Sequence, residues 1–291
     1  MTVDPQIAAL LERVNAAPPL SSGTPEEGRA AFRALNLVAA RFVPEVEVGS
    51  VEEVSGGPVP MRVYRPSGDA LGTLVFMHGG GFVIGDLDSY DYQCRVLCSR
   101  IGVTVVSVDY RLAPEHPFPA GVEDALAAFE WTQANETGPY VVGGESAGGN
   151  LATVVARGAD AQLLLYPITD FVTQHPSIEE NGERLLLTKT DMEWFNGHYL
   201  GGDEALRSDP RASPALGELA GLPTTLIYTA QYDPLRDDGD AYAEALSAAG
   251  VKVIHRRFEG LIHGFFGLGP LSQAAAAAVD RVCEDVREVL R

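Results

Sequence analysis

The sequence predicts an α/β fold, with a mostly parallel sheet flanked by helices. Short continuous apolar runs alternate with helix-length segments along most of the 291 residues, a pattern typical of parallel strands joined by crossover helices. Hydrophobic residues make up 46% of the chain, which is ample for a large buried core. These observations exclude a disordered chain and favour one large α/β domain or two small ones.

Charge and cysteine content restrict the partners and the compartment. The chain has 21 Lys and Arg residues against 40 Asp and Glu residues, a formal net charge of −19. This acidity opposes binding to nucleic-acid phosphates and anionic membranes, although it can also serve only to keep the chain in solution. Three cysteines, an odd number, argue against a disulfide framework. With no signal-peptide pattern and no apolar run of membrane-spanning length, we expect a soluble, cytoplasmic protein that neither binds nucleic acid nor inserts into a membrane.

The first elements are predicted to be helical and to precede the sheet. Residues 5–43 show helical apolar spacing that is interrupted at 18–23, so two helices joined by a loop are expected. We assign residues 1–45 to an N-terminal cap. Residues 46–54 and 59–64 then alternate in polarity on either side of a Gly-Gly pair, which predicts an antiparallel hairpin at a sheet edge.

Six apolar runs and five helical segments follow the hairpin and bring the predicted sheet to eight strands. Strands are expected at residues 74–77, 103–108, 140–142, 162–166, 225–229 and 251–256. Helices are expected at residues 90–101, 121–134, 147–157, 237–249 and 273–291. Residues 171–214 interrupt this alternation and carry a helical pattern of their own around 189–200. We interpret 171–207 as an inserted cap segment between two parts of the core, 46–170 and 208–291.

Ser146 is the candidate nucleophile. Gly144-Glu145-Ser146-Ala147-Gly148 matches the pattern G-x-S-x-G, which alone is weak evidence because such matches also arise by chance. Its place between a predicted strand and a predicted helix is what a nucleophile elbow requires, and an ordinary glycine-rich turn is the weaker alternative. The two glycines then have a physical reason, since a side chain at either position would collide with the crowded turn.

A run of glycines after a predicted strand is the candidate oxyanion site. In His78-Gly79-Gly80-Gly81 the absence of side chains lets backbone N–H groups approach a ligand, and attack on a carbonyl creates the negative charge that such donors stabilise. We predict that the N–H groups of Gly79, Gly80 and Ala147 form the oxyanion hole. A phosphate-binding loop is disfavoured because no Gly-Lys-Ser/Thr follows, and a purely structural turn is the other alternative.

His263 is the predicted general base. A serine hydroxyl needs a base to take its proton, and histidine is the side chain whose unperturbed pKa lies nearest neutrality. His263 should follow the last strand by a short loop and so project from the same edge of the sheet as the serine. The remaining histidines lie in the glycine motif, a proline-rich loop, the inserted segment or a strand; they are His78, His116, His175, His198 and His255.

Asp233 is the predicted partner of the histidine. It follows the strand expected at 225–229, where its carboxylate can accept the second N–H of the imidazole and fix the tautomer. Asp237 and Asp238 are rivals, but we expect them to cap the helix that begins there. No pair of His or carboxylate ligands recurs at helical spacing near the serine, so no metal site is predicted.

Several motifs occur in a fixed order along the chain. They are His78-Gly79-Gly80-Gly81, Asp109-Tyr110-Arg111-Leu112-Ala113-Pro114-Glu115, Gly144-Glu145-Ser146-Ala147-Gly148-Gly149-Asn150, Tyr166-Pro167, Asp233-Pro234-Leu235 and His263-Gly264-Phe265. In this order they resemble the hormone-sensitive-lipase-like family of bacterial carboxylesterases, also called family IV, which has the α/β-hydrolase fold with a helical cap. The resemblance runs from about Phe42 to the C-terminus and is far more specific than any one motif.

The resemblance implies an enzyme that hydrolyses short-chain acyl esters by a Ser-His-Asp acyl-enzyme mechanism, needs no cofactor and commonly forms a homodimer. It also implies that Asp109, Tyr110 and Arg111 are scaffolding near the oxyanion loop. The chain departs from the family at Glu145, where aspartate is usual, and its connections flanking the nucleophile strand are short. The negative charge is kept, so we expect activity to survive the change.

An acyl pocket needs apolar walls, and four aromatic residues are candidates for them. They are Phe82, Trp194, Phe195 and Tyr199, for which plain packing of cap on core is an equally good explanation. Two other functions remain open. A non-catalytic small-molecule receptor can share the fold, as plant gibberellin receptors do, but those lack the histidine that is present here. Amide or peptide hydrolysis on the same triad would use the same groups.

Overall fold

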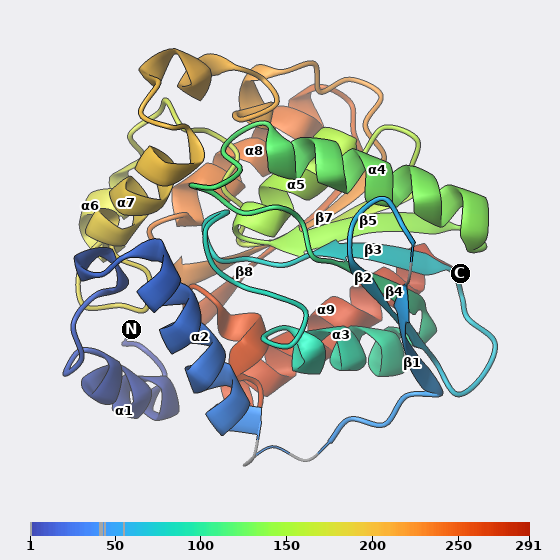
Figure 1. Ribbon diagram of the computed structural model, residues 1–291, viewed down its shortest axis with the longest axis horizontal. Coiled ribbons are helices and arrows are strands. Elements are labelled where there is room, and N and C mark those ends of the chain that lie inside the picture. Colours follow the sequence, from blue (N-terminus) through green and yellow to red (C-terminus); the bar gives the residue numbers. More distant parts are fainter. Residues whose placement is uncertain (1, 41–42, 44, 55) are drawn as a thin grey trace.

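The computed structural model describes residues 2–40, 43, 45–54 and 56–291, with side chains for all of these except 37–40. In this part of the chain, eight strands form one sheet in the order β1-β2-β4-β3-β5-β6-β7-β8. The pairs β1–β2 and β2–β4 are antiparallel, and all other pairs are parallel. Helices cover both faces of the sheet (Figure 1), so the predicted fold class is confirmed.

The strands in the middle of the sheet are short and buried. The bounds of all eight strands are β1 Ser50–Val54, β2 Met61–Arg65, β3 Thr73–Met77, β4 Thr104–Val108, β5 Tyr140–Glu145, β6 Ala161–Leu165, β7 Thr224–Tyr232 and β8 Val253–Ile262. Every residue of β3, β4 and β6 is buried. A strand covered by helices on both faces is apolar throughout, which is why continuous apolar runs predicted these strands well.

The first arm of the predicted hairpin is shorter than expected. β1 begins at Ser50, and the chain before it leaves the sheet. At Gly49 the backbone passes so close to Pro66 that an added Cβ would lie 2.5 Å from the proline carbonyl oxygen. Val46 and Val48 pack against the apolar core, so their apolar character reflects core packing and not strand pairing.

The last two strands are longer than expected. β7 continues to Tyr232 and β8 to Ile262. Exposed residues alternate with partly buried ones along most of β8, so its second half shows no continuous apolar run. The prediction that a short loop separates the last strand from His263 is therefore wrong. Asp233 and His263 each follow the end of a strand directly.

Helices on the two faces of the sheet enclose two apolar clusters. The α-helices are α1 Pro5–Val14, α2 Pro25–Ala40, α3 Asp91–Leu97, α4 Ala120–Asn135, α5 Ala147–Val155, α6 Pro176–Asn181, α7 Lys189–Tyr199, α8 Arg236–Ala248 and α9 Gln273–Val289. One face is covered by α4, α5 and α8 and the other by α3 and α9 (Figure 1). Along β3, Val75 and Met77 belong to the apolar cluster under α4, α5 and α8, while Leu74 and Phe76 belong to the cluster under α3 and α9. The helix expected at 90–101 ends as an α-helix at Leu97 and continues as a π-helical turn.

The N-terminal helices and the inserted segment lie together at one end of the sheet. Figure 1 shows α1 and α2 beside α6 and α7. The backbone N–H of Ser21 donates to the Asp191 carboxylate at 3.0 Å, and the Asn15 side chain donates to the Arg184 carbonyl at 3.0 Å. α7 reaches the loop after β3, because Phe195 occupies the space where a Cβ of Gly81 would lie. Both segments therefore cover the end of the sheet at which the parallel strands terminate.

Candidate active site

Ser146 lies on a sharp turn between β5 and α5. Its φ of 54° is in the left-handed region, which a residue with a side chain rarely adopts. The flanking glycines make this turn possible. A Cβ on Gly148 would lie 2.0 Å from the Met77 carbonyl oxygen, and one on Gly144 would lie 2.3 Å from the Gly148 backbone. The predicted steric reason for the two glycines is thus present in the structure.

Three polar side chains meet where β5, β7 and β8 end. His263 Nε2 lies 3.1 Å from Ser146 Oγ, and His263 Nδ1 lies 2.8 Å from Asp233 Oδ2. The Asp233 side chain is fully buried, and its other oxygen accepts the Leu235 N–H at 2.8 Å. Because the aspartate accepts the Nδ1 proton, Nε2 is left as an acceptor facing the serine. This geometry can move the serine proton to the imidazole.

The two rival carboxylates lie elsewhere. Asp237 accepts the Ser177 N–H at 2.9 Å, and Asp238 accepts the Thr169 N–H at 2.9 Å. Both residues are in the first turn of α8, but these hydrogen bonds join α8 to the inserted segment and to the chain after β6. The expectation that they cap the helix is corrected accordingly, because tertiary contacts use their oxygen atoms.

The predicted oxyanion loop follows β3 in an unusual backbone conformation. Gly80 and Gly81 have φ values of 108° and 59°, which favour glycine. A Cβ on Gly80 would lie 2.2 Å from the Ile84 carbonyl oxygen. The Tyr90 hydroxyl lies against Gly79, where an added Cβ would be 2.9 Å from it. The loop is therefore shaped by its own close contacts, and one of its two predicted donors lies beside a buried tyrosine.

His78, the residue that precedes these glycines, packs against a buried tyrosine. It is fully buried, and burial lowers its pKa to about 4, so the ring is neutral near pH 7. Its ring stacks on Tyr110 at a centroid distance of 4.3 Å, and the Tyr110 hydroxyl donates to the His78 carbonyl at 2.8 Å. These contacts agree with a scaffolding role for the segment that contains Tyr110.

The four aromatic residues predicted for an acyl pocket are mostly packed between cap and core. Phe82 and Tyr199 stack with centroids 3.6 Å apart, and both are buried. Phe195 is buried against Gly81, and Trp194 contacts Phe195 edge to face. The four therefore fill space beside the predicted oxyanion loop, and their role toward a substrate stays a prediction.

A cavity of about 130 Å³ lies between the inserted segment and the loop after Asp233. Its lining includes apolar side chains, among them Phe171, Ile178, Met192 and Leu235, and the buried carboxylate of Asp238. None of the four predicted aromatic residues lines it. Sequence reasoning missed this cavity because its walls come from segments far apart in the chain.

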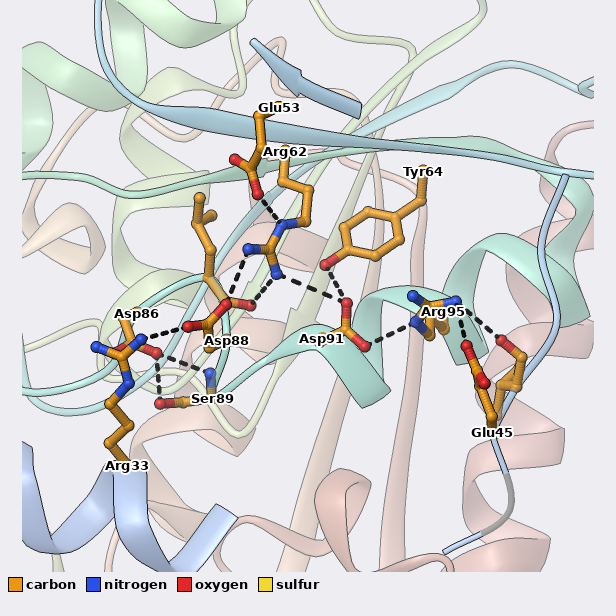
Figure 2. Close-up of polar contacts among 12 residues, drawn as sticks. Arg33, Glu45, Glu53, Arg62, Tyr64, Asp86, Asp88, Ser89, Asp91 and Arg95 are labelled. Atoms are coloured by element: carbon orange, nitrogen blue, oxygen red, sulfur yellow. Dashed lines mark hydrogen bonds and ion pairs between the residues drawn. The ribbon is translucent and has the colours of Figure 1, made fainter. Parts of the chain in front are cut away.

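Ion pairs anchor the loop between β3 and α3 to neighbouring elements (Figure 2). Arg62 on β2 contacts Asp88 at 2.8 Å and Asp91 at 3.6 Å. Arg33 on α2 pairs with Asp88 and, at 3.5 Å, with Asp86. Helix α2, which belongs to the predicted N-terminal cap, therefore contacts the loop that starts at the predicted oxyanion site.

Three further properties concern the described residues as a group. No three His, Cys, Asp or Glu side chains among them converge in a way that could hold a metal ion. None of the helices in this part of the chain is both long enough and apolar enough to cross a membrane. The three cysteines are buried free thiols.

Comparison with known proteins gives consistent matches. A family model described as "alpha/beta hydrolase fold" matches residues 74–267. Carboxylic ester hydrolase LipN of Mycobacterium tuberculosis is 44% identical over 268 residues, which cover 84% of this chain and 71% of LipN. Ethyl acetate hydrolase of Pseudomonas putida is 35% identical over the whole of both chains. The solved structure of a hyperthermophilic esterase from Pyrobaculum calidifontis is 36% identical, with a TM-score of 0.91 and 99% of each chain covered.

An eight-stranded, mostly parallel sheet with a serine elbow after β5 defines the α/β-hydrolase class. The matches narrow this class, since carboxylic ester hydrolases and esterases recur among the similar proteins. The chain belongs to the hormone-sensitive-lipase-like family of α/β hydrolases, and it is a carboxylic ester hydrolase.

Proposed function

We propose that this enzyme hydrolyses esters of short acyl chains through an acyl-enzyme formed on Ser146. The observation that carries the proposal is the continuous hydrogen-bonded line from Ser146 Oγ through His263 to Asp233, with distances of 3.1 Å and 2.8 Å. In this position His263 acts as the general base and Asp233 orients it.

The reaction takes place in two halves. His263 removes the proton of Ser146 as the hydroxyl attacks the ester carbonyl, and the N–H groups of Gly79, Gly80 and Ala147 stabilise the oxyanion. His263 then protonates the departing alcohol. In the second half, the same imidazole activates a water molecule that releases the acid and regenerates the serine.

Two observations support a preference for short acyl chains. The aromatic residues beside the oxyanion loop are closely packed, with Phe82 stacked on Tyr199 at 3.6 Å and Phe171 at 6.3 Å from Phe82. This packing leaves little room for a long chain. A relative that aligns over its whole length is named an ethyl acetate hydrolase, an enzyme for a two-carbon acyl group.

The test is hydrolysis of p-nitrophenyl esters of increasing acyl length by the wild type and by Ser146→Ala. We expect kcat/KM to be highest for short acyl groups and to fall by at least about 10⁴-fold in the variant, because the nucleophile is removed. A matched p-nitroanilide is the control for amide hydrolysis, and we expect slower turnover of it. An inactive wild type, or a variant as active as the wild type, would refute the proposed mechanism.

A further inference from the structure

Glu145, the residue before the nucleophile, is buried and belongs to no part of the mechanism described so far. It is 6% exposed and ends β5. Its Oε2 accepts the Tyr166 hydroxyl at 2.7 Å, and the Tyr90 hydroxyl interacts electrostatically with the same carboxylate. Burial raises the pKa of both tyrosines well above the usual value, so both hydroxyls keep their protons and act as donors.

Each of these tyrosines also holds a loop of the candidate site. The Tyr90 hydroxyl lies against Gly79 in the predicted oxyanion loop, where a Cβ added to the glycine would be 2.9 Å from that hydroxyl. The Tyr166 ring packs edge to face against Phe265, two residues after His263, with centroids 5.1 Å apart. One carboxylate therefore joins the serine turn to both loops that face it.

Tyr166 adds a direct contact with the base. The edge of its ring packs against the imidazole of His263, with centroids 4.9 Å apart and planes inclined at 60°. Tyr166 itself has a φ of 39°, an unusual conformation for a residue with a side chain. Its backbone N–H donates to the Tyr228 carbonyl at 2.7 Å, so both the backbone and the hydroxyl of Tyr166 are hydrogen-bonded.

We propose that Glu145 is a positioning residue that, through Tyr90 and Tyr166, aligns the oxyanion loop and the histidine loop with Ser146, and whose negative charge favours the imidazolium form of His263. The proposal rests on the proposed function, because it assumes that His263 accepts the serine proton. The second half of the role is electrostatic, since the proton taken from Ser146 Oγ makes the imidazole a cation in a buried site.

The charges around Glu145 agree with this role. Burial raises the pKa of Glu145 overall, although the interactions with the two tyrosines and with His263 oppose this shift. Cys94 and Tyr110 are further titratable groups that interact with it electrostatically, and burial keeps both protonated. Among these neighbours, His263 is the group that becomes cationic during the reaction.

The main experiment compares Glu145→Gln with the wild type across pH. The amide keeps the size of the side chain but removes its charge. We expect kcat to fall about tenfold or more with KM within about twofold, because Glu145 contacts no substrate. We also expect the acid limb of kcat/KM to move to lower pH by about half a unit or more, since the imidazolium loses a favourable interaction and the neutral base persists to lower pH.

The second variant, Glu145→Asp, separates the effect of the negative charge from the effect of side-chain length. It keeps the negative charge but retracts the carboxylate by about 1.5 Å, so it cannot hold both tyrosines as the longer side chain does. We expect the acid limb to stay where it is in the wild type while kcat falls. A role in folding alone would lower thermal stability in both variants and leave the acid limb of both unchanged.

Tyr90→Phe and Tyr166→Phe test the hydrogen bonds even if the glutamate variants fail to fold. Each should lower kcat by about threefold to tenfold at unchanged KM. Tyr228→Phe is the matched control, because the Tyr228 hydroxyl donates to another buried carboxylate, Asp285, at 3.0 Å on the side of the sheet covered by α9. We expect the control to keep the wild-type kcat.

The proposal is overturned if folded Glu145→Gln keeps kcat within about twofold and the same acid limb, or if both tyrosine variants behave like Tyr228→Phe. The parallel Ser146→Ala measurement tells this failure apart from failure of the proposed function. An active wild type with an inactive Ser146→Ala leaves the mechanism intact whatever Glu145 does.

Discussion

At the scale of single residues, the position of one carboxylate decides which aspartate can orient His263, the proposed base. Asp233 and Asp237 lie four positions apart and are both acidic, but only Asp233 contacts His263. Asp237 pairs with Arg236 and accepts the Ser177 N–H. The difference arises because Asp233 directly follows the strand beside the one that leads to His263, whereas Asp237 is already in α8.

Asp233→Asn should therefore remove most of the activity. The amide can donate to Nδ1 and so favours the wrong tautomer, and we expect kcat to fall by about 10³-fold to 10⁴-fold. Asp237→Asn is the matched control and should keep kcat within about threefold. Steady-state kinetics on a short-chain p-nitrophenyl ester measure both. Similar losses in the two variants would contradict the assignment of Asp233.

At the scale of elements, a buried carboxylate fastens α8 to the chain that follows β6. Asp238 accepts the N–H groups of Thr169 and Asp170 at 2.9 and 3.3 Å, and its other oxygen pairs with the Thr169 hydroxyl. Burial raises the pKa of Asp238 to about 7, although the hydrogen bonds oppose the shift. The folded protein therefore holds this proton more tightly than the unfolded chain does.

The sign of the pH effect follows from this difference. The stability contributed by protonated Asp238 is complete below the unfolded pKa near 3.8 and is lost as pH rises through about 7. Asp238→Asn resembles the protonated form, so the fall in Tm of the wild type between about pH 5 and pH 8 should become shallower by a few degrees. Differential scanning calorimetry across this range measures the change.

Asp237→Asn provides the contrast at the neighbouring position. Burial would raise the pKa of Asp237, but the hydrogen bond and charge of Arg236 lower it overall. Its contribution to stability is therefore present at neutral pH and lost in acid. A Tm profile of Asp238→Asn that parallels the wild type throughout would show that Asp238 is ionised in the folded protein.

At the scale of the whole molecule, α2 joins the predicted N-terminal cap to the core. Arg29 donates to the carbonyl groups of Val83 and Ala113, each at 2.7 Å, and pairs with Glu115. Val83 lies in the loop that begins with the predicted oxyanion glycines. A substitution of Arg29 should therefore weaken the contact between α2 and the core and also alter the loop that begins with the predicted oxyanion glycines.

Arg29→Met should loosen the cap and slow catalysis. It leaves two buried carbonyl groups without this donor, at a cost of about 1–3 kcal/mol for each such group. We expect faster proteolysis between α1 and α2 and a fall in kcat/KM of about tenfold. Arg33→Met is the control on the same helix, because its ion pairs with Asp86 and Asp88 are largely exposed and contribute at most about 1 kcal/mol. Equal effects in the two variants would contradict the special role of Arg29.

The sequence by itself determined the fold class, the order of the elements and the three residues proposed for the chemistry. Apolar runs predict buried strands because such strands contact helices on both faces, and the glycines around Ser146 are needed for a local steric reason. These features depend on residues that are close together in the chain. Local patterns alone therefore suffice to place Ser146 and Asp233 after strands.

The tertiary structure decided what depends on residues far apart in the chain. In the structure β1 begins only at Ser50, because Val46 and Val48 pack against the core. Asp238, which was expected to cap a helix, instead accepts the Thr169 N–H. The tertiary structure also gave Glu145 two tyrosine partners that lie 55 residues before it and 21 after it. Sequence spacing carries no signal for such contacts, since they form only when the sheet brings separate strand ends to one edge.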